Sequence, residues 1–168
     1  MKNIILSLIL AFAFIGCSSK SDEATQNAEP KLVVGKSLKG MTLKDQNEKS
    51  ITVPEDTKVI FFSFSKPTGH ACNAFLESKP ANYLAEHKAV YVADVSAAPG
   101  IIKNMFILPD LKELEFPILL INDDTLSAEY SKGMDKESIV VVELEDMQIK
   151  AIKKAKDEKE LEKSLNKN

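Results

Sequence analysis

The chain has 168 residues, of which 44% are hydrophobic and 28% are charged, and its formal net charge is −3. This composition is typical of one globular domain with short appendages. Nucleic-acid binders use clustered cations against phosphates and arginine forks against bases. Arginine is absent from the sequence, so the composition argues against nucleic acid as a partner.

The N-terminus has the pattern of an export signal. Lys2 precedes an almost unbroken apolar run over residues 3–15. The run is shorter than the roughly 20 apolar residues that a transmembrane helix needs, and it matches the hydrophobic region of a secretory signal peptide. We therefore expect residues 1–16 to be a signal peptide.

The residues at the end of this run, Phe14-Ile15-Gly16-Cys17, resemble the lipobox of bacterial lipoproteins. The resemblance implies that Cys17 is lipidated, becomes the first residue of the mature protein and is held to the membrane by its acyl chains. Ser18 stands where an inner-membrane retention signal would have aspartate. The resemblance therefore implies a place in the bacterial cell envelope, on the outer membrane and facing the periplasm.

A polar segment follows the lipobox. Residues 18–31 are small and polar, without apolar periodicity, which is typical of a flexible tether. The expected organisation is a lipoprotein signal peptide at 1–16, a lipidated tether at 17–31 and one globular domain at 32–168. Once Cys17 carries lipid, Cys72 is the only thiol left, so the mature chain cannot form an internal disulfide.

Apolar patterns in the globular part predict strands. Residues 41–44 and 50–53 alternate apolar and polar side chains around a turn, which predicts a β-hairpin. Continuous apolar runs are typical of strands buried on both faces. Three such runs cover residues 58–64, 89–95 and 116–122. A second hairpin is expected from residues 138–144 and 147–152.

Helices are expected between the buried strands and at the C-terminus. The first covers residues 70–86, with a kink or break at Pro80. The second begins at Pro99, because proline is favourable in the first turn of a helix. Asp157, with Glu160 three residues later, predicts the capping box of a final helix.

The resulting order is hairpin, β, α, β, α, β, β, β, α, in which alternating strands and helices imply parallel pairing and right-handed crossovers. This order, with the hairpin lead-in at 35–47 and the apolar strand 61–64 ahead of a helix, resembles the thioredoxin-like superfamily. The resemblance implies an α/β fold with a central mixed sheet flanked by helices and an N-terminal β-hairpin. Phe116-Pro117 stands where thioredoxin folds carry a cis-proline, so the resemblance implies a cis bond before Pro117.

The redox motif of the superfamily is incomplete in this chain. Thioredoxins carry Trp-Cys-x-x-Cys where the strand meets the helix. Here Gly69 takes the place of the first cysteine, Cys72 takes the place of the second, and tryptophan is absent. The resemblance is therefore to a degenerate member. Its candidate catalytic residues are Cys72 near a helix N-terminus, where the dipole favours a thiolate, His70 beside it, and Pro117.

Two other chemistries fit the residues less well. A peroxiredoxin motif needs proline, threonine and cysteine at set intervals. Pro67, Thr68 and Cys72 are the right types at the wrong distances, and the arginine that these enzymes use is missing. A copper carrier could use His70 and Cys72 as soft ligands, but a third ligand is not evident unless a methionine such as Met105 serves. The sequence indicates no cofactor and no metal.

Our first hypothesis is a lipid-anchored cell-envelope protein whose thioredoxin-like domain is non-catalytic and binds or scaffolds another protein. The alternative is an enzyme, a thiol-disulfide oxidoreductase that forms mixed disulfides through its single Cys72. The expected partners are the membrane, through the lipid on Cys17, and an envelope protein whose identity the sequence leaves open.

Overall fold

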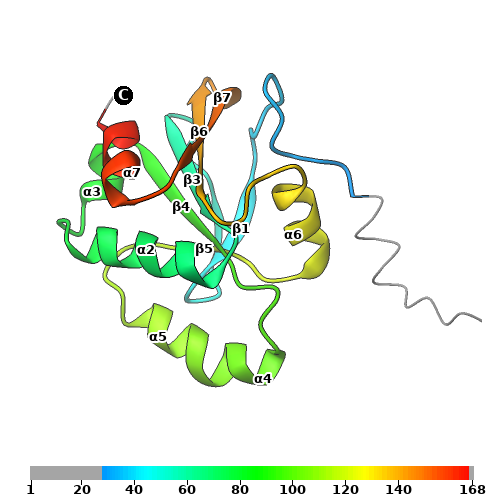
Figure 1. Ribbon diagram of the computed structural model, residues 1–168, viewed down its shortest axis with the longest axis vertical. Coiled ribbons are helices and arrows are strands. Elements are labelled where there is room, and N and C mark those ends of the chain that lie inside the picture. The colour runs from blue at the N-terminus through cyan, green and yellow to red at the C-terminus, as the bar shows by residue number, and fades with distance from the viewer. Residues whose placement is uncertain (1–27, 167–168) are drawn as a thin grey trace, which may run out of the picture.

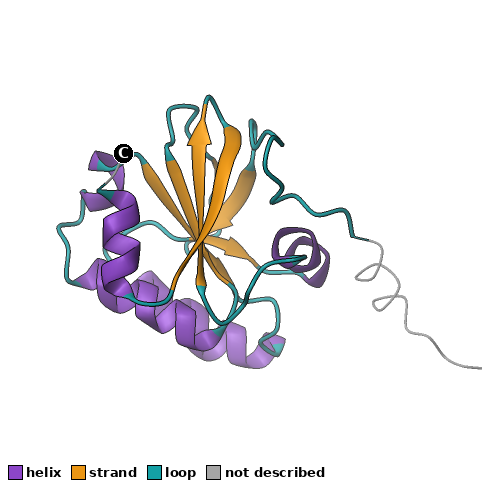
Figure 2. Ribbon diagram, turned by 45° about the horizontal axis from the view of Figure 1, so that its top comes forward, coloured by secondary structure: helices purple, strands orange, loops and turns teal. Residues whose placement is uncertain are grey.

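The computed structural model describes residues 28–166, and the expected signal peptide and Cys17 lie outside the described residues. A mixed sheet of seven strands forms the centre of the domain, in the order β2-β1-β5-β4-β3-β6-β7. Helix α6 lies on one side of the sheet, and the other helices lie on the opposite side (Figures 1 and 2). The predicted α/β fold, with a central mixed sheet flanked by helices and an N-terminal hairpin, is confirmed.

The strands are β1 (Thr42–Asp45), β2 (Ser50–Thr52), β3 (Val59–Ser63), β4 (Ala89–Asp94), β5 (Leu119–Ile121), β6 (Ile139–Glu145) and β7 (Gln148–Ala155). The α-helices are α2 (Lys66–Glu77), α3 (Tyr83–Glu86), α4 (Gly100–Ile102), α5 (Leu108–Lys112), α6 (Asp124–Ser131) and α7 (Glu158–Leu165), and a π-helix η1 (Lys103–Ile107) joins α4 to α5.

The three central strands are parallel. β3 pairs with β4, and β4 pairs with β5, because a helical crossover joins each of these strands to the next. Both crossovers move in the same direction across the sheet, so right-handed connections place α2 and the α4–η1–α5 segment on the same face. The β1–β2 hairpin adds antiparallel strands beside β5, and the β6–β7 hairpin does so beside β3.

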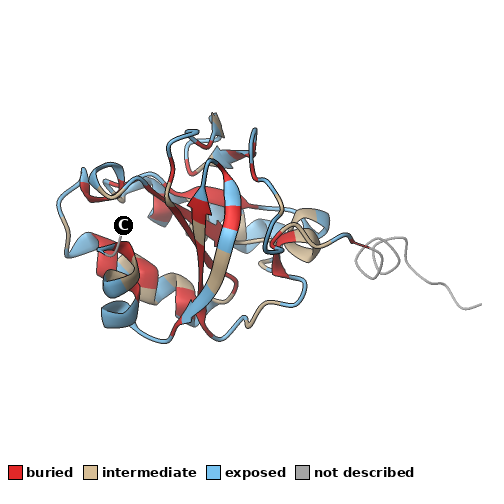
Figure 3. Cartoon of the chain, turned by 90° about the horizontal axis from the view of Figure 1, so that it is seen from above, coloured by how far each residue is buried: buried red, intermediate tan, exposed pale blue. Residues whose placement is uncertain are grey.

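Strand β3 shows why the central apolar runs are continuous. All five of its residues are buried, because both faces of the sheet are covered (Figure 3). Val59 and Phe61 face the core beneath α2, whereas Ile60 and Phe62 face the core beneath α6. Successive side chains of a strand point to opposite faces, so a strand covered on both sides needs apolar residues at every position.

The first predicted helix differs from the observed one at its start. Helix α2 begins at Lys66, four residues before His70, and ends at Glu77. The chain turns after it, and the short helix α3 begins at Tyr83. The break predicted at Pro80 is therefore confirmed, and the predicted start at His70 is wrong.

Helix α6 was not among the predicted elements. Its N-cap is Asp123, whose carboxylate accepts a hydrogen bond from the backbone N–H of Leu126 at 2.9 Å. The helix packs on the sheet mainly through Leu126 and Tyr130. Two apolar side chains one turn apart are too few to make an apolar period visible in the sequence.

The described chain packs against α6 from its first residue. Ala28 is buried, and its carbonyl oxygen accepts a hydrogen bond from Lys132 Nζ at 2.8 Å. The backbone N–H of Lys31 donates to Glu129 O at 2.9 Å, and the two side chains form an ion pair at 2.7 Å. Residues 28–31, which the sequence analysis placed in the tether, therefore pack against the domain, and the rest of the expected tether lies outside the described residues. Within residues 28–166, none of the helices has the length and apolar character needed to cross a bilayer.

Candidate functional site

The corner between β3 and α2 is the place where the redox motif was expected. Ser65 is the N-cap of α2 in an extended conformation, and Pro67 lies in the first turn, where its missing N–H costs nothing. Thr68 Oγ1 accepts a hydrogen bond from the Ser65 N–H at 3.2 Å and donates to Ser65 O at 2.9 Å. Hydroxyl groups therefore hold the corner where thioredoxins place their cysteines.

Cys72 lies deeper in the helix than the sequence implied. It follows Lys66, the first residue of α2, by six positions, which is about 9 Å along a helix axis. The favourable effect of the helix dipole on an anion is confined to about the first turn. The prediction that Cys72 sits at a helix N-terminus is therefore wrong, because Gly69 and Cys72 both follow the corner at Ser65–Thr68.

The thiol of Cys72 is enclosed by the core. Its side chain has an exposed fraction of 0%, and it belongs to the core cluster that contains Phe61, Phe75 and Tyr91. Burial raises the pKa of Cys72 from its ordinary value of 9.0 to about 12, although a hydrogen bond with Tyr91 opposes this effect. At neutral pH the side chain is a protonated thiol, and the thiolate is the form that attacks disulfides.

A small polar network surrounds the sulfur. The hydroxyl groups of Ser63 and Tyr91 are 2.9 Å apart, and Tyr91 also hydrogen-bonds with Cys72. The Tyr91 ring stacks on Phe61 with 4.9 Å between ring centroids, and burial raises the pKa of Tyr91 well above its ordinary value. The network satisfies polar groups beneath α2, and it offers Cys72 no base that could take its proton.

The raised pKa of Cys72 predicts a loss of stability at alkaline pH. Because the folded-state pKa of about 12 exceeds the ordinary value of 9.0, the folded state holds the proton more tightly. The stabilisation is fully present below about pH 9 and is lost as the pH rises toward about 12, by about 4 kcal/mol at most. Urea unfolding at about pH 8 and at about pH 10 measures this loss. Between these two pH values, the free energy of unfolding of wild type should fall by about 1 kcal/mol more than that of Cys72→Ala. Equal losses would contradict the enclosure of the thiol.

His70 and Cys72 do not form a site together. His70 is exposed, whereas Cys72 is buried. Residues two positions apart on a helix point about 200° from each other, so their side chains cannot meet. This geometry removes His70 as a base or a second metal ligand for Cys72. In residues 28–166, no three side chains of His, Cys, Asp or Glu are grouped closely enough to hold a metal ion.

The bond before Pro117 is trans, since no peptide bond in residues 28–166 is cis. The predicted cis-proline is therefore wrong. The buried side chain of Gln46 pairs with the backbone on both sides of Pro117, donating to Phe116 O at 2.8 Å and accepting from the Ile118 N–H at 2.9 Å. Gln46 thus holds this segment extended as it enters β5, with Phe116 and Ile118 in the core and Pro117 exposed.

Gln46 is expected to be important for stability. The variant Gln46→Ala should lose about 2–4 kcal/mol of unfolding free energy, because it leaves two buried backbone groups without partners. Chemical denaturation followed by circular dichroism measures the loss. Asn47→Ala is the matched control, since Asn47 is exposed in the same turn and should change stability little. A loss for Gln46→Ala no larger than that of the control would show that these two hydrogen bonds contribute nothing.

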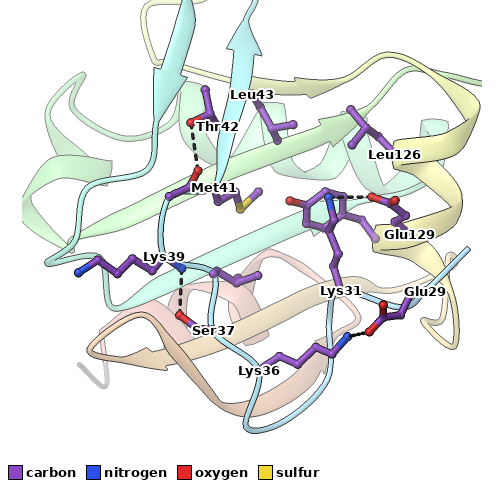
Figure 4. Close-up of a pocket in the computed structure, with 13 residues that line it drawn as sticks. Glu29, Lys31, Lys36, Ser37, Lys39, Met41, Thr42, Leu43, Leu126 and Glu129 are labelled. Atoms are coloured by element: carbon purple, nitrogen blue, oxygen red, sulfur yellow. Dashed lines mark hydrogen bonds and ion pairs between the residues drawn. The ribbon is translucent and has the colours of Figure 1, made fainter.

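A hollow of about 540 Å³ lies on the opposite face of the sheet from Cys72, between α6 and the segment that leads into β1 (Figure 4). All three lysines that line it are paired with carboxylates. Lys31 pairs with Glu129 at 2.7 Å, and Lys36 pairs with Glu29. Lys39 extends away from both and pairs with Glu55 at 3.2 Å. These pairs neutralise the charge that an anionic ligand would need, so the hollow does not compete with Cys72 as a candidate site.

The sequence matches no protein-family model and no curated protein. Solved structures of similar fold include a secreted disulfide oxidoreductase of Mycobacterium tuberculosis, with 14% identity and a TM-score of 0.52, covering 77% of this chain and 96% of that chain. The thioredoxin domain of a thiol-disulfide oxidoreductase of Bacteroides vulgatus has 12% identity and a TM-score of 0.52, covering 81% and 97%. A thioredoxin-like protein of Porphyromonas gingivalis has 15% identity and a TM-score of 0.50, covering 84% and 93%.

At these identities the likenesses establish the fold alone. The chain has a thioredoxin-like fold, as the order of its predicted elements indicated. It shares this fold with thiol-disulfide oxidoreductases. At the turn between β3 and α2, this chain has the hydroxyl side chains of Ser65 and Thr68.

Proposed function

We propose that the chain is a lipid-anchored protein of the bacterial cell envelope whose thioredoxin-like domain binds another envelope protein and performs no thiol chemistry. One observation carries the non-catalytic part of this proposal. Cys72 has an exposed fraction of 0% beneath α2, and burial raises its pKa to about 12.

Dithiol exchange needs an exposed thiolate that attacks and a second cysteine that resolves the mixed disulfide. Cys72 is the one cysteine within residues 28–166, and it is buried. The corner residues Ser65 and Thr68 carry hydroxyl groups, which do not exchange with disulfides. A thioredoxin-like domain without an exposed thiol in its described residues is left with binding as its role, and the identity of the bound envelope protein stays open.

The anchoring part of the proposal rests on the sequence Phe14-Ile15-Gly16-Cys17 and on the apolar run before it. The polar residues that follow would separate the lipid from the domain, which packs from Ala28 onward. A lipidated Cys17 also explains how a chain without a membrane-spanning helix in its described part would stay at a membrane.

The alternative function, a single-cysteine thiol-disulfide oxidoreductase, is favoured by the shared fold. It requires Cys72 to reach solvent, and therefore requires α2 to separate from Phe61 and Tyr91. Such an enzyme would attack a disulfide of a client or of an oxidised small thiol, forming a mixed disulfide and releasing one thiolate. An external thiol would then attack the mixed disulfide and set Cys72 free.

Disulfide exchange by the purified mature protein separates the two functions. Wild type should form no mixed disulfide with oxidised glutathione and should not turn over a disulfide substrate in the presence of reduced glutathione. The variant Lys66→Cys is the positive control, because Lys66 is exposed at the N-terminus of α2, where a thiolate is stabilised. Exchange by wild type at a rate similar to Lys66→Cys, and lost in Cys72→Ala, would establish the enzyme and overturn our proposal.

A further inference from the structure

The helix that follows β4 has an apolar face without a partner in residues 28–166. Ile101, Ile102, Met105 and Phe106 are exposed to 73%, 45%, 63% and 56%. Ile102, Met105 and Phe106 follow Ile101 by one, four and five positions, so the four side chains lie on one side of a helix. The other side is attached to the domain, since Ile107, Leu108 and Leu111 pack against the core. We call these four exposed residues the α4–η1 face.

A proline explains the irregular helix beneath this face. The backbone N–H of Leu108 bonds to Lys103 O, five residues earlier, which is the π-helical pattern. Pro109 has no N–H, and its ring would clash with the carbonyl group of Met105 in a regular α-helix. The wider turn avoids that clash. Lys103 Nζ donates to Asn122 O at 2.9 Å and fixes the helix beside the end of β5, so the face is held in place.

We propose that the α4–η1 face lies on the phospholipid surface of the membrane to which the chain is anchored; this inference rests on the lipid anchor of the proposed function. Charge is the first argument. From residue 95 to residue 109 the sequence contains no acidic side chain and a single cation, Lys103. Bacterial phospholipid surfaces are anionic, so they repel carboxylates and accept a lysine beside an apolar face.

The position of the tether is the second argument. Ala28 is hydrogen-bonded to Lys132 at the end of α6. Residues of α6 share a hollow with Ser96 and Ala97, which lie just before Gly100, the first residue of α4. Ala28, the first described residue, thus lies beside α6, and α4 is the end of the α4–η1–α5 segment nearer to α6 (Figure 1).

The length of the tether is compatible with this contact. Cys17 and Ala28 are separated by 11 peptide steps, 28 minus 17, which span at most about 40 Å. The lipid therefore keeps the domain within reach of the bilayer, where weak apolar contacts add to a strong anchor. A second copy fits less well, because four partly exposed side chains offer less than the about 800 Å² that each partner of a standard interface buries.

A fluorescent probe on the face tests the inference. The full chain is expressed with its signal peptide in a Gram-negative host, as Met105→Cys in a Cys72→Ala background, so that the new thiol is the one free to be labelled. It is labelled with nitrobenzoxadiazole and reconstituted in vesicles of phosphatidylethanolamine and phosphatidylglycerol. We expect a blue-shifted emission, quenching by nitroxide-labelled lipids, and severalfold weaker quenching by iodide. The same probe at Val34→Cys, an exposed residue outside the face, should show the emission and the iodide quenching of a probe in water. Adding Phe106→Asp should give the probe at Met105→Cys the same signals.

Each outcome decides the inference. Flotation of the vesicles with the protein verifies the anchor separately. If the protein floats and the probe at Met105→Cys stays in water, the face does not touch the bilayer, although the anchor stands. Protection from iodide without quenching by nitroxide lipids would mean that protein, including a second copy, covers the face, and would also overturn the inference. A chain that carries no lipid and does not float would overturn both the anchor and the inference.

Discussion

Alkylation of Cys72 in the folded protein is expected to be at least about 1,000-fold slower than in the unfolded chain, because a rise in pKa from about 9 to about 12 lowers the thiolate fraction by that factor at a pH near 8. The exposed fraction of 0% should slow the reaction further, since iodoacetamide cannot reach the sulfur unless α2 opens. Mass spectrometry of the protein after timed exposure, in buffer and in guanidinium chloride, measures both rates.

The variant Lys66→Cys again supplies the internal comparison. Its new thiol should be alkylated quickly in the native protein, while Cys72 in the same molecule stays unmodified. Peptide mapping after digestion assigns the label to one or the other residue. Native labelling of Cys72 within about tenfold of the unfolded rate would show that the core around Phe75 and Tyr91 opens often, and would restore Cys72 as a candidate nucleophile.

The variant Cys17→Ser is expected to abolish membrane attachment. Wild type expressed with its signal peptide should carry the mass of its acyl chains on Cys17 and should sediment with the membranes, because lipid chains that enter the bilayer hold the protein there. Cys17→Ser cannot be lipidated and should leave the membrane fraction after carbonate extraction.

Cys72→Ser is the control for this result, since it removes the other thiol of the chain and should leave lipidation unchanged. Mass spectrometry of the N-terminal peptide measures lipidation in both variants, and fractionation measures their membrane attachment. An N-terminal peptide of wild type that begins at a residue other than Cys17, or that carries no acyl mass, would refute the lipobox interpretation.

The architecture could be predicted because the central strands are covered on both faces. Residues 58–64 are apolar at nearly every position since β3 contributes to two cores, and such a run is hard to confuse with a short amphipathic helix. Helix α6 has too few apolar residues to give such a signal, because Leu126 and Tyr130 provide most of its apolar contact with the sheet. Its one clear sequence signal was Asp123, whose side chain caps the helix.

The site was harder to predict, and the error had a local cause. Lys66-Pro67-Thr68-Gly69 reads as a loop, because proline and glycine usually interrupt regular structure. Proline is nevertheless well tolerated in the first turn of a helix, and Ser65 with Thr68 three residues later supplies the cap. Recognising that cap in the sequence would have placed the helix start at Lys66 and Cys72 well inside the helix.

The prediction for Pro117 failed because a long-range contact decides the backbone there. Gln46 is separated from Phe116 by 70 residues along the chain. The sequence pattern does not predict that the Gln46 amide group will pair with the backbone around Pro117. The same holds for Tyr91 of β4, which reaches Cys72 of helix α2. Side chains that meet only through the fold of the sheet leave no periodic signal.

The redox state of Cys72 in growing cells tests most directly whether the domain functions without thiol chemistry. Cells are quenched in acid, free thiols are blocked under denaturing conditions, and disulfides are then reduced and labelled with a heavier reagent. Our account predicts that Cys72 is recovered entirely as a free thiol, in cells that are also challenged with an oxidant. Recovery of Cys72 in a mixed disulfide with a client protein or a small thiol would contradict it.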